Sequence, residues 1–415
     1  WLTPVFQGHR SECPQEKWEN EMASPATSRS LDRFAQGKLE DLEARSLRRR
    51  LIETDRYGPA LARRAGRELI SFCCNDYLNL SHRKEVKEAA RAALERYGAG
   101  SGASRLVTGN HPLFRTLEKR LARLKETDDC VIFGSGYLAN LGIVPALARE
   151  GDLVLADELS HACLLSGTKL SGAETRIFRH NDLDHLKTLL EEERAKHRHC
   201  LILTDGVFSM DGDLAPVEEM GELARAHDAW LMSDDAHGIG VLAGGKGSSF
   251  IGGRKADVPL QMGTLSKAIG SYGGYLCASQ PVVDFIRTRA RTLIYSTGLP
   301  PASVAASIAA LDLIEADPAF AALPVKKAKA FTRALNLPEA ESPIVPILMG
   351  DPDKTLAASA LLEEEGFLVT AIRPPTVPEG TARLRFTFTA EHEDKDIERL
   401  TAIIRDKILI DRAAE

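Results

Sequence analysis

The stretch "AWLMSDDAHGIG" (residues 229–240) passes directly from an apolar run to two carboxylates, an imidazole and two glycines. An apolar run that ends in polar and turn residues is typical of a buried strand in an α/β protein. Asp234, Asp235 and His237 follow this strand within four positions. Such a group could bind a metal, share a proton or hold a cofactor, and the choice between these roles decides the function.

The same pattern recurs on both sides of this stretch, from about residue 110 onward. Short apolar runs alternate with longer amphipathic segments such as "PLFRTLEKRLARLK" and "VEEMGELARAH", which is the rhythm of βα units around a mostly parallel sheet. The sequence therefore predicts an α/β fold with a wide open sheet. The predicted strands are "CVIF" (130–133), "LVLA" (153–156), "CLILT" (200–204), "WLMS" (230–233), "LQMG" (260–263) and "YLCAS" (275–279).

A second, smaller α/β group is predicted beyond the long helical segment "ASVAASIAALDLIEA". Its predicted elements are "PIVPIL", the helix "DKTLAASALLEEEG", "FLVTAI", "RLRFTFT" and the closing helix "DKDIERLTAIIRDKI". Met22 resembles a natural start, so we expect residues 1–21 to be an extension outside the fold. The predicted domains are an amino-terminal extension poorly ordered at its start (1–34), a helical arm (35–75), a large domain (76–310) and a small carboxyl-terminal α/β domain (311–415).

Composition excludes several classes of protein. The 415 residues carry a net charge of -6 with acids and bases interspersed, which gives no basic field for nucleic acid. Seven cysteines without a paired or zinc-like spacing do not form a disulfide framework, so a reducing compartment fits best. No window reaches the ~18 apolar residues of a membrane span. We therefore expect a cytoplasmic protein with neither nucleic acid nor membrane as its partner.

In open α/β sheets, ligands lie outside the carboxyl ends of the strands, so the polar residues after each apolar run deserve inspection. Gly134, Ser135 and Gly136 follow one predicted strand and precede a predicted helix, which presents backbone N–H groups to one spot and suits a phosphate. His161 in "DELSHACL" and Ser209 in "TDGVFSMDGD" lie just beyond two further strands. The glycine turn alone favours a functional and a purely geometric role about equally, whereas His161 or Ser209 alone is more often structural.

The segment "GTLSKAIGSYGG" (263–274) contributes a lysine in a setting of small residues. Lys267 comes three residues after Thr264 and is followed by Gly270, Gly273 and Gly274. Glycines let a flat group approach the backbone. A lysine held among them can lose its proton and act as an amine nucleophile. This pattern favours a reactive lysine over a solvated surface charge.

Together these pieces predict a pyridoxal phosphate site. The aldehyde of this cofactor requires a lysine, its phosphate requires a backbone cradle with hydroxyls, and its ring nitrogen requires a carboxylate. A metal hydrolase is the rival interpretation, but strand alternation would point the adjacent side chains of Asp234 and Asp235 to opposite faces. A non-catalytic binding module is a third reading, and it gives no role to Lys267.

The chain resembles the α-oxoamine synthase family of fold-type I pyridoxal phosphate enzymes. The resemblance implies a large, mostly parallel sheet domain with a smaller carboxyl-terminal α/β domain, assembled as a homodimer with shared active sites. It runs from about residue 35 to 410 through the blocks "NDYLNLS", "GASRLVTGNHPLFRTLE", "DELSHACL", "TDGVFSMDGDLAP", "DDAHGIGVL", "GTLSKAIGSYGG", "IYSTGLPP" and "AIRPPTVPEGTARLRFTFTAEHE".

The resemblance also implies a role for each candidate residue of the cofactor site. Lys267 would form a Schiff base with the cofactor and later act as acid and base at the substrate α-carbon. Asp234 would face the pyridinium nitrogen and His237 would hydrogen-bond the phenolic oxygen, while His161 would stack on the ring face. Further cofactor contacts are implied for Gly136, Tyr137, Ser209 and Thr264, and for Thr297 at the phosphate of the neighbouring subunit.

Substrate contacts are implied in the same way. Asn75 and Arg385 would hold the amino-acid carboxylate, and the planar fork of an arginine suits that role. Arg48 and Thr376, together with His161, match further substrate-contact positions.

The implied reaction is a decarboxylative condensation of an amino acid with an acyl thioester. The block "AIRPPTVPEGTARLR" favours the branch that joins L-alanine to pimeloyl-CoA or a pimeloyl carrier protein. Branches that use glycine with acetyl-CoA or succinyl-CoA, or serine with a long acyl-CoA, remain open. Asp205, which some relatives replace by Glu, and the loop "GNHP" (109–112) leave acyl-chain selectivity undecided.

Overall fold

The computed structural model describes residues 29–409 and divides the chain into two compact units, residues 1–51 and 52–415. The predicted start at Met22 and most of the predicted extension 1–34 lie outside the described residues. The first unit contains helix α2 (Ser30–Ala44), and none of the residues of that helix is buried. Arg48 lies just beyond it and pairs with Glu43 at 3.0 Å.

The second unit opens with three antiparallel strands, β1 (Asp55–Gly58), β2 (Leu61–Arg64) and β3 (Arg67–Ser71). The prediction of a helical arm over 35–75 is therefore wrong for residues 55–71. Ala65 and Gly66, which join β2 to β3, both have positive φ, the conformation that a two-residue type I′ hairpin turn requires. This turn reverses the chain in a segment whose Arg, Leu and Glu content favours a helix.

Seven strands of the described chain form the central sheet in the order β4-β10-β9-β8-β7-β5-β6. Strands β5 to β9 run parallel, and β10 is antiparallel to both of its neighbours. The predicted α/β class and all six predicted strands of this sheet are confirmed. The seventh strand, the mostly exposed edge strand β6, was not predicted from the sequence. The strands are β4 (Asp129–Phe133), β5 (Leu153–Asp157), β6 (Glu174–Phe178), β7 (Cys200–Asp205), β8 (Trp230–Asp234), β9 (Leu260–Thr264) and β10 (Gly274–Ala278).

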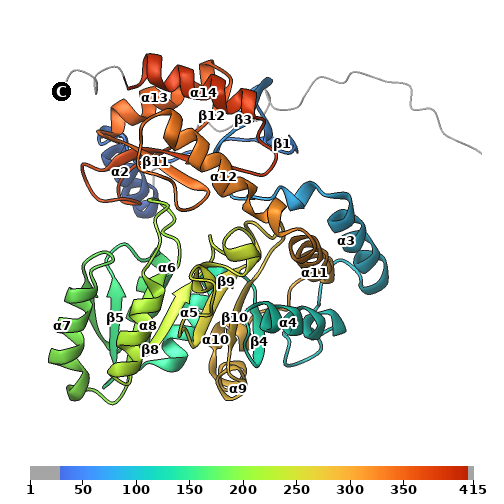
Figure 1. Ribbon diagram of the computed structural model, residues 1–415, viewed down its shortest axis with the longest axis vertical. Coiled ribbons are helices and arrows are strands. Elements are labelled where there is room, and N and C mark those ends of the chain that lie inside the picture. Colours follow the sequence, from blue (N-terminus) through green and yellow to red (C-terminus); the bar gives the residue numbers. More distant parts are fainter. Residues whose placement is uncertain (1–28, 410–415) are drawn as a thin grey trace, which may run out of the picture. The chain divides into compact units, whose positions relative to one another are not determined.

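Helices pack on this sheet and bury both of its faces (Figure 1). Alternation along β4 shows the two cores, because Ile132 belongs to one hydrophobic cluster whereas Val131 and Phe133 belong to another. Strands buried on both faces are continuously apolar, which is why the runs were recognisable in the sequence. The helices of this region are α3 (Lys84–Tyr97), α4 (Pro112–Leu124), α5 (Gly136–Leu147), α6 (Ala162–Ser171), α7 (Leu183–Glu193), α8 (Val217–Ala226), α9 (Gln280–Arg289), α10 (Arg291–Ile294) and α11 (Pro301–Ala316).

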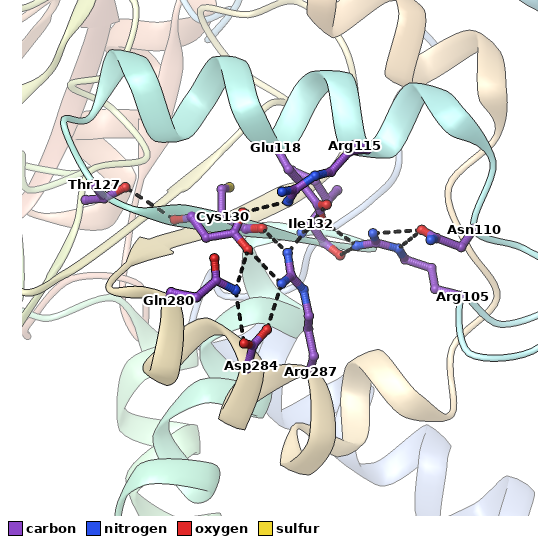
Figure 2. A network of polar contacts seen from close by, with 11 residues as sticks. Arg105, Asn110, Arg115, Glu118, Thr127, Cys130, Ile132, Gln280, Asp284 and Arg287 are labelled. Atoms are coloured by element: carbon purple, nitrogen blue, oxygen red, sulfur yellow. Dashed lines mark hydrogen bonds and ion pairs between the residues drawn. The ribbon is translucent and has the colours of Figure 1, made fainter.

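Side chains close the outer edge of the sheet along β4 (Figure 2). The carbonyl oxygens of Cys130 and Ile132 accept hydrogen bonds from Arg287 (2.8 Å) and Arg105 (3.2 Å). The N–H of Ile132 donates to the buried carboxylate of Glu118, which also pairs with Arg105 at 2.7 Å. An edge strand with free backbone groups is a template for pairing with another chain. This network satisfies those groups from within the chain.

The carboxyl-terminal part adds a smaller α/β group, with a sheet in the order β11-β14-β13. The predicted single strand "FLVTAI" is divided, because β12 (Phe367–Leu368) pairs with β3 while β13 (Thr370–Ile372) pairs with β14. In the described residues, 29–409, we find no helix of the length and apolar character that a bilayer crossing needs. The remaining elements are α12 (Pro318–Ala334), β11 (Ile344–Gly350), α13 (Pro352–Glu364), β14 (Ala382–Thr387) and α14 (Asp394–Lys407).

A buried histidine links β3 to this smaller group. The ring of His392 stacks on Phe72 with 3.9 Å between centroids. Its Nδ1 accepts from the N–H of Thr389 (2.9 Å), so Nε2 carries the proton and donates to the carbonyl of Ser71 (3.0 Å). Burial lowers the pKa of His392 from 6.5 to about 3. The folded protein therefore holds this ring neutral.

His392 should make the stability depend on pH. Between 6.5 and about 3 the unfolded chain binds more protons than the folded chain, so the free energy of unfolding falls as the pH falls through 6.5. From about pH 7.5 to about 5.5 the wild type should lose about 1.4 kcal/mol more than a His392→Gln variant. Urea denaturation at both pH values measures this difference. A His199→Gln variant, which changes an exposed histidine, should behave like the wild type.

Candidate active site

Four parallel strands end in polar residues at one edge of the central sheet. Strands β5, β7, β8 and β9 close with Asp157, Asp205, Asp234 and Thr264. The register pairs Asp205 with Asp234 across β7 and β8. The residues selected because they follow apolar runs are thus brought to one edge, the usual ligand site of an open α/β sheet.

Lys267 lies at the centre of this group. Its Nζ is 2.8 Å from Nε2 of His237, and Nδ1 of His237 is 2.6 Å from the hydroxyl of Tyr77. Burial lowers the pKa of Lys267 to about 8, although the nearby Asp234 acts in the opposite direction. A lysine that loses its proton this readily can act as a nucleophile toward a carbonyl group.

His237 is held neutral between these two partners. Burial and then the charge of Lys267 keep the pKa of His237 well below its usual value. Burial also raises the pKa of Tyr77 to about 12, so the phenol keeps its proton. A neutral imidazole whose Nδ1 is held by Tyr77 can present its Nε2 to a ligand oxygen without adding a charge.

The two adjacent aspartates have different partners. Asp234 accepts hydrogen bonds from Nδ2 of Asn140 (2.7 Å) and from the N–H of Ala236 (3.0 Å). Asp235 instead pairs with the buried Lys125 at 2.8 Å. The described residues contain no group of three or more His, Cys, Asp or Glu side chains placed to hold a metal. The carboxylates of Asp234 and Asp235 therefore serve two separate environments.

Asp205 is the second carboxyl group beside Asp234. Its Oδ2 accepts from the backbone N–H of His161 at 2.7 Å. Burial, followed by the charge of Asp234, raises the pKa of Asp205 well above its usual value. The contact fixes the backbone of His161, whose side chain remains accessible to solvent. His161 therefore lies beside the carboxyl group of Asp205, and its imidazole ring is exposed to solvent.

The start of α5 lies against the end of β9. Gly136 is its first residue, and the Ser135 side chain accepts a hydrogen bond from the N–H of Leu138. A Cβ at Gly136 would lie 3.3 Å from Cβ of Thr264, so this turn lies close against the end of β9. The hydroxyls of Thr264 and Ser266 are 2.8 Å apart. A helix N-terminus beside two hydroxyls suits a phosphate.

These groups fit pyridoxal phosphate. The amine of Lys267 matches its aldehyde, the carboxyl group of Asp234 matches its ring nitrogen, and the turn at Gly136 with Thr264 matches its phosphate. His237 offers a hydrogen-bond donor for the phenolic oxygen, and His161 offers a flat ring that can stack on the cofactor. We propose that Lys267, Asp234, His237, His161, Gly136 and Thr264 hold the cofactor.

Arg385 joins the smaller sheet to this edge. It lies buried on β14, and its Nε donates to the carbonyl oxygen of Ser209 at 2.5 Å. Its Nη1 donates to Oδ1 of Asn75 at 3.2 Å. The structure therefore brings together three predicted residues that lie far apart in the sequence. In this arrangement Ser209 contributes its backbone oxygen.

Four further predicted residues are Thr297, Tyr137, Thr376 and Arg48. Thr297 forms an isolated bridge with Ser104 and lines a small cavity together with Gly134. Tyr137 is 50% exposed, and Thr376 lies exposed in the segment between β13 and β14. Arg48 belongs to the first unit, where it pairs with Glu43. The roles of these residues stay predictions.

Tyr77, Asn140 and Cys163 are among the residues of the site that were not singled out from the sequence. Tyr77 lies within the block "NDYLNLS", where only Asn75 drew attention. Asn140 comes one helical turn after Gly136, so helical spacing could have selected it. Cys163 is two residues after His161, and its thiol carried no signal in the sequence.

Comparison with known proteins places these observations in a family. The model of the family described as aminotransferase class I and II matches residues 67–404. A relative from Methylocella silvestris named 8-amino-7-oxononanoate synthase is 64% identical over 83% of this chain and 98% of its own. A relative from Parvibaculum lavamentivorans, provisionally given the same name, is 69% identical over 93% of this chain and 100% of its own.

Two solved structures share the fold. A high-resolution structure of SPT with a PLP internal aldimine has a TM-score of 0.85 at 27% identity and covers 91% of this chain and 98% of its own. A crystal structure of 8-amino-7-oxononanoate synthase from Francisella tularensis has a TM-score of 0.71 at 26% identity and covers 83% and 99%. The predicted fold-type I architecture is confirmed by these similarities.

Proposed function

The chain belongs to the aminotransferase class I and II family, and on this premise we propose that it catalyses the 8-amino-7-oxononanoate synthase reaction of biotin synthesis. In that reaction L-alanine condenses with pimeloyl-CoA or a pimeloyl carrier protein, and the thiol and carbon dioxide leave. The observation that carries the proposal is the cluster of Lys267, His237 and Asp234 in a chain 64% identical to a synthase of that name.

Bound pyridoxal phosphate supplies an aldehyde for the substrate amine and a ring that withdraws electrons from the α-carbon. Lys267 removes the α-proton of L-alanine and returns a proton later, which its lowered pKa permits near neutral pH. With the cofactor bound, Asp234 would pair with the ring nitrogen, and a carboxylate there would stabilise a positive charge on that nitrogen. His237 would donate a hydrogen bond to the phenolic oxygen. Arg385 and Asn75 hold the carboxylate of L-alanine.

The choice of this branch rests on identity and not on shape. The TM-score to SPT is 0.85, above the 0.71 to the Francisella tularensis synthase, so the fold does not separate the branches. Two relatives named 8-amino-7-oxononanoate synthase are 64% and 57% identical to this chain, while the SPT and Francisella tularensis synthase structures are both more distant, at 27% and 26%. The high identity of the first two relatives supports L-alanine and a pimeloyl thioester as the substrates.

A panel of substrate pairs tests the proposal. L-Alanine, glycine and L-serine are each assayed with pimeloyl-CoA, acetyl-CoA, succinyl-CoA and palmitoyl-CoA. We expect the L-alanine and pimeloyl-CoA pair to give the highest kcat/KM, by at least about tenfold. A pimeloyl carrier protein in place of pimeloyl-CoA identifies the preferred donor. A higher kcat/KM for glycine with acetyl-CoA would assign the chain to another branch.

We also propose a cytoplasmic homodimer in which Thr297 reaches the phosphate in the neighbouring subunit. Support comes from the resemblance to the α-oxoamine synthases and from exposed aromatic side chains. Tyr295 is 72% exposed, Tyr272 53% and Tyr137 50%. Tyrosines are enriched in protein interfaces, so a partner subunit would explain why they are left uncovered.

A further inference from the structure

We propose that Asn140 and Cys163 are positioning residues, which together fix Asp234 and His161 in the orientation that the reaction uses. This inference rests on the proposed function, because it takes Asp234 and His161 as the groups on either side of the cofactor. It adds a buried hydrogen-bonded chain that joins those two groups behind the site.

Asn140 is the centre of this chain. Its side chain is fully buried on α5, and Nδ2 lies 2.7 Å from Oδ2 of Asp234. A carboxylate only accepts, so the nitrogen end of the amide must face Asp234. The same nitrogen has a second hydrogen, which it directs to Sγ of Cys163 at 3.0 Å. One amide group thus connects strand β8 to helix α6.

This orientation of the Asn140 amide leaves its oxygen without a hydrogen bond within the described part of the chain. Oδ1 of Asn140 is buried and has no hydrogen-bond partner among the described residues. A buried carbonyl oxygen without a partner is unfavourable, and native proteins contain few of them. The contact with Asp234 therefore decides which way the amide points. An unsatisfied atom of this kind is expected where orientation matters more than stability.

Cys163 connects Asn140 to His161 through its thiol. Its Sγ lies 2.7 Å from Nδ1 of His161, and its backbone N–H points to the same nitrogen at 3.3 Å. Burial, and then the charge of Asp234, raises the pKa of the Cys163 thiol to about 12. The thiol therefore keeps its hydrogen and donates it to Nδ1. A nitrogen that accepts from two donors carries no proton, so neutral His161 has its proton on Nε2.

As a consequence, the side chains of Asp234 and His161 are each held in one orientation. Hydrogen bonds from Asn140 and from the N–H of Ala236 hold both oxygens of the Asp234 side chain in one orientation. The imidazole of His161 is fixed at Nδ1 by Cys163, while its backbone N–H is held by Asp205. Without the thiol only the longer contact from the backbone N–H of Cys163 would hold Nδ1, so the ring would be less firmly fixed and its tautomers would begin to mix.

The first experiment measures the tautomer directly. Full-length protein labelled with ¹⁵N-histidine is studied by NMR before pyridoxal phosphate is added, and a His161→Gln variant assigns the signal. We expect a neutral ring with its proton on Nε2 in the wild type and in Cys163→Ser, whose hydroxyl can still donate. Cys163→Ala keeps only the longer contact from the backbone N–H to Nδ1 (3.3 Å), so its signals should shift part of the way toward those of mixed tautomers. A Cys200→Ala variant, which removes a buried thiol at the other end of β7, should match the wild type.

The second experiment measures the holoenzyme. Asn140→Leu removes the donor to Asp234, and the isosteric Asn140→Asp replaces the amide by a second buried carboxyl group, so each should lower kcat about 10- to 100-fold. The KM for pimeloyl-CoA should stay within about twofold, because the Asn140 side chain is fully buried and contacts Asp234 and Cys163. Two Asn140 variants are used so that a folding defect in one does not decide the result.

The outcomes separate the two proposals. An unchanged His161 signal in Cys163→Ala, or wild-type kcat in both Asn140 variants, would overturn the positioning role. A shifted His161 signal in Cys163→Ala, in a protein that does not condense L-alanine with pimeloyl-CoA, would keep the positioning role and reject the proposed function. If Cys163→Ser keeps the wild-type His161 signal and Cys163→Ala does not, the side chain of residue 163 acts as a hydrogen-bond donor and not only by packing.

Discussion

A Lys267→Ala variant is expected to lose about 10,000-fold in kcat while remaining folded. The substitution removes the only amine placed against His237 in the described residues, at 2.8 Å, and with it the base at the α-carbon. General acid and base catalysis contributes about 100- to 10,000-fold, and loss of the covalent link to the cofactor adds to this effect. Steady-state assays with L-alanine and pimeloyl-CoA measure the loss.

Two further readouts show that Lys267 itself carries the chemistry. Borohydride should bleach the yellow wild type and add the mass of the cofactor to the peptide that contains Lys267, whereas Lys267→Ala should show neither change. Exchange of the α-proton of L-alanine in heavy water should also stop in the variant. Lys246→Ala is the matched control, because Lys246 pairs with Glu126 at the surface and should keep wild-type activity. A Lys267→Ala protein with normal turnover would refute the assignment.

The central sheet was predictable from the sequence because its strands are buried on both faces. Continuous apolar runs such as "CLILT" leave little choice of structure when short polar turns bound them. The hairpin strands β2 and β3 offered no such run, since Arg63 and Glu68 pair across them at the surface. Their Arg, Leu and Glu residues are good helix formers, and pairing between strands overrides that local preference.

The division of "FLVTAI" into β12 and β13 could not be predicted for a related reason. The segment fits one strand locally, but its two halves find different partners, β3 and β14. Those partners lie at opposite ends of the sequence. Local pattern predicts that a strand forms, whereas its neighbours are set by the packing of the whole chain.

The candidate site divides in the same way. Lys267, Asp234 and His237 were recognisable because their residue types carry chemistry and follow buried strands. Asn140 and Cys163 are a neutral amide and a thiol, which in a sequence look like ordinary buried side chains. Their meaning depends on the distances of 2.7 Å to Asp234 and 2.7 Å to His161, which only the packing of α5 and α6 creates.

An Asp234→Asn variant should lose roughly 100- to 1,000-fold in kcat with little change in thermal stability. The amide keeps the size of the carboxylate but removes the negative charge that holds a proton on the ring nitrogen, and loss of one such electrostatic group typically costs this much. Binding of pyridoxal phosphate should persist, because Gly136, Thr264 and Lys267 are unchanged. Steady-state kinetics and the melting temperature of the holoenzyme measure the two effects.

The neighbouring Asp235→Asn variant is the sharpest control, because it should give the opposite result. Asp235 forms a fully buried pair with Lys125 at 2.8 Å, and removing one partner of such a pair costs about 3–5 kcal/mol of stability. We therefore expect a lower melting temperature with nearly normal kcat for the folded fraction. Equal loss of kcat in both variants at unchanged stability would mean that the two carboxylates act on one ligand. That result would revive the metal-site reading of residues 229–240 and reject the separate roles that the structure gives to Asp234 and Asp235.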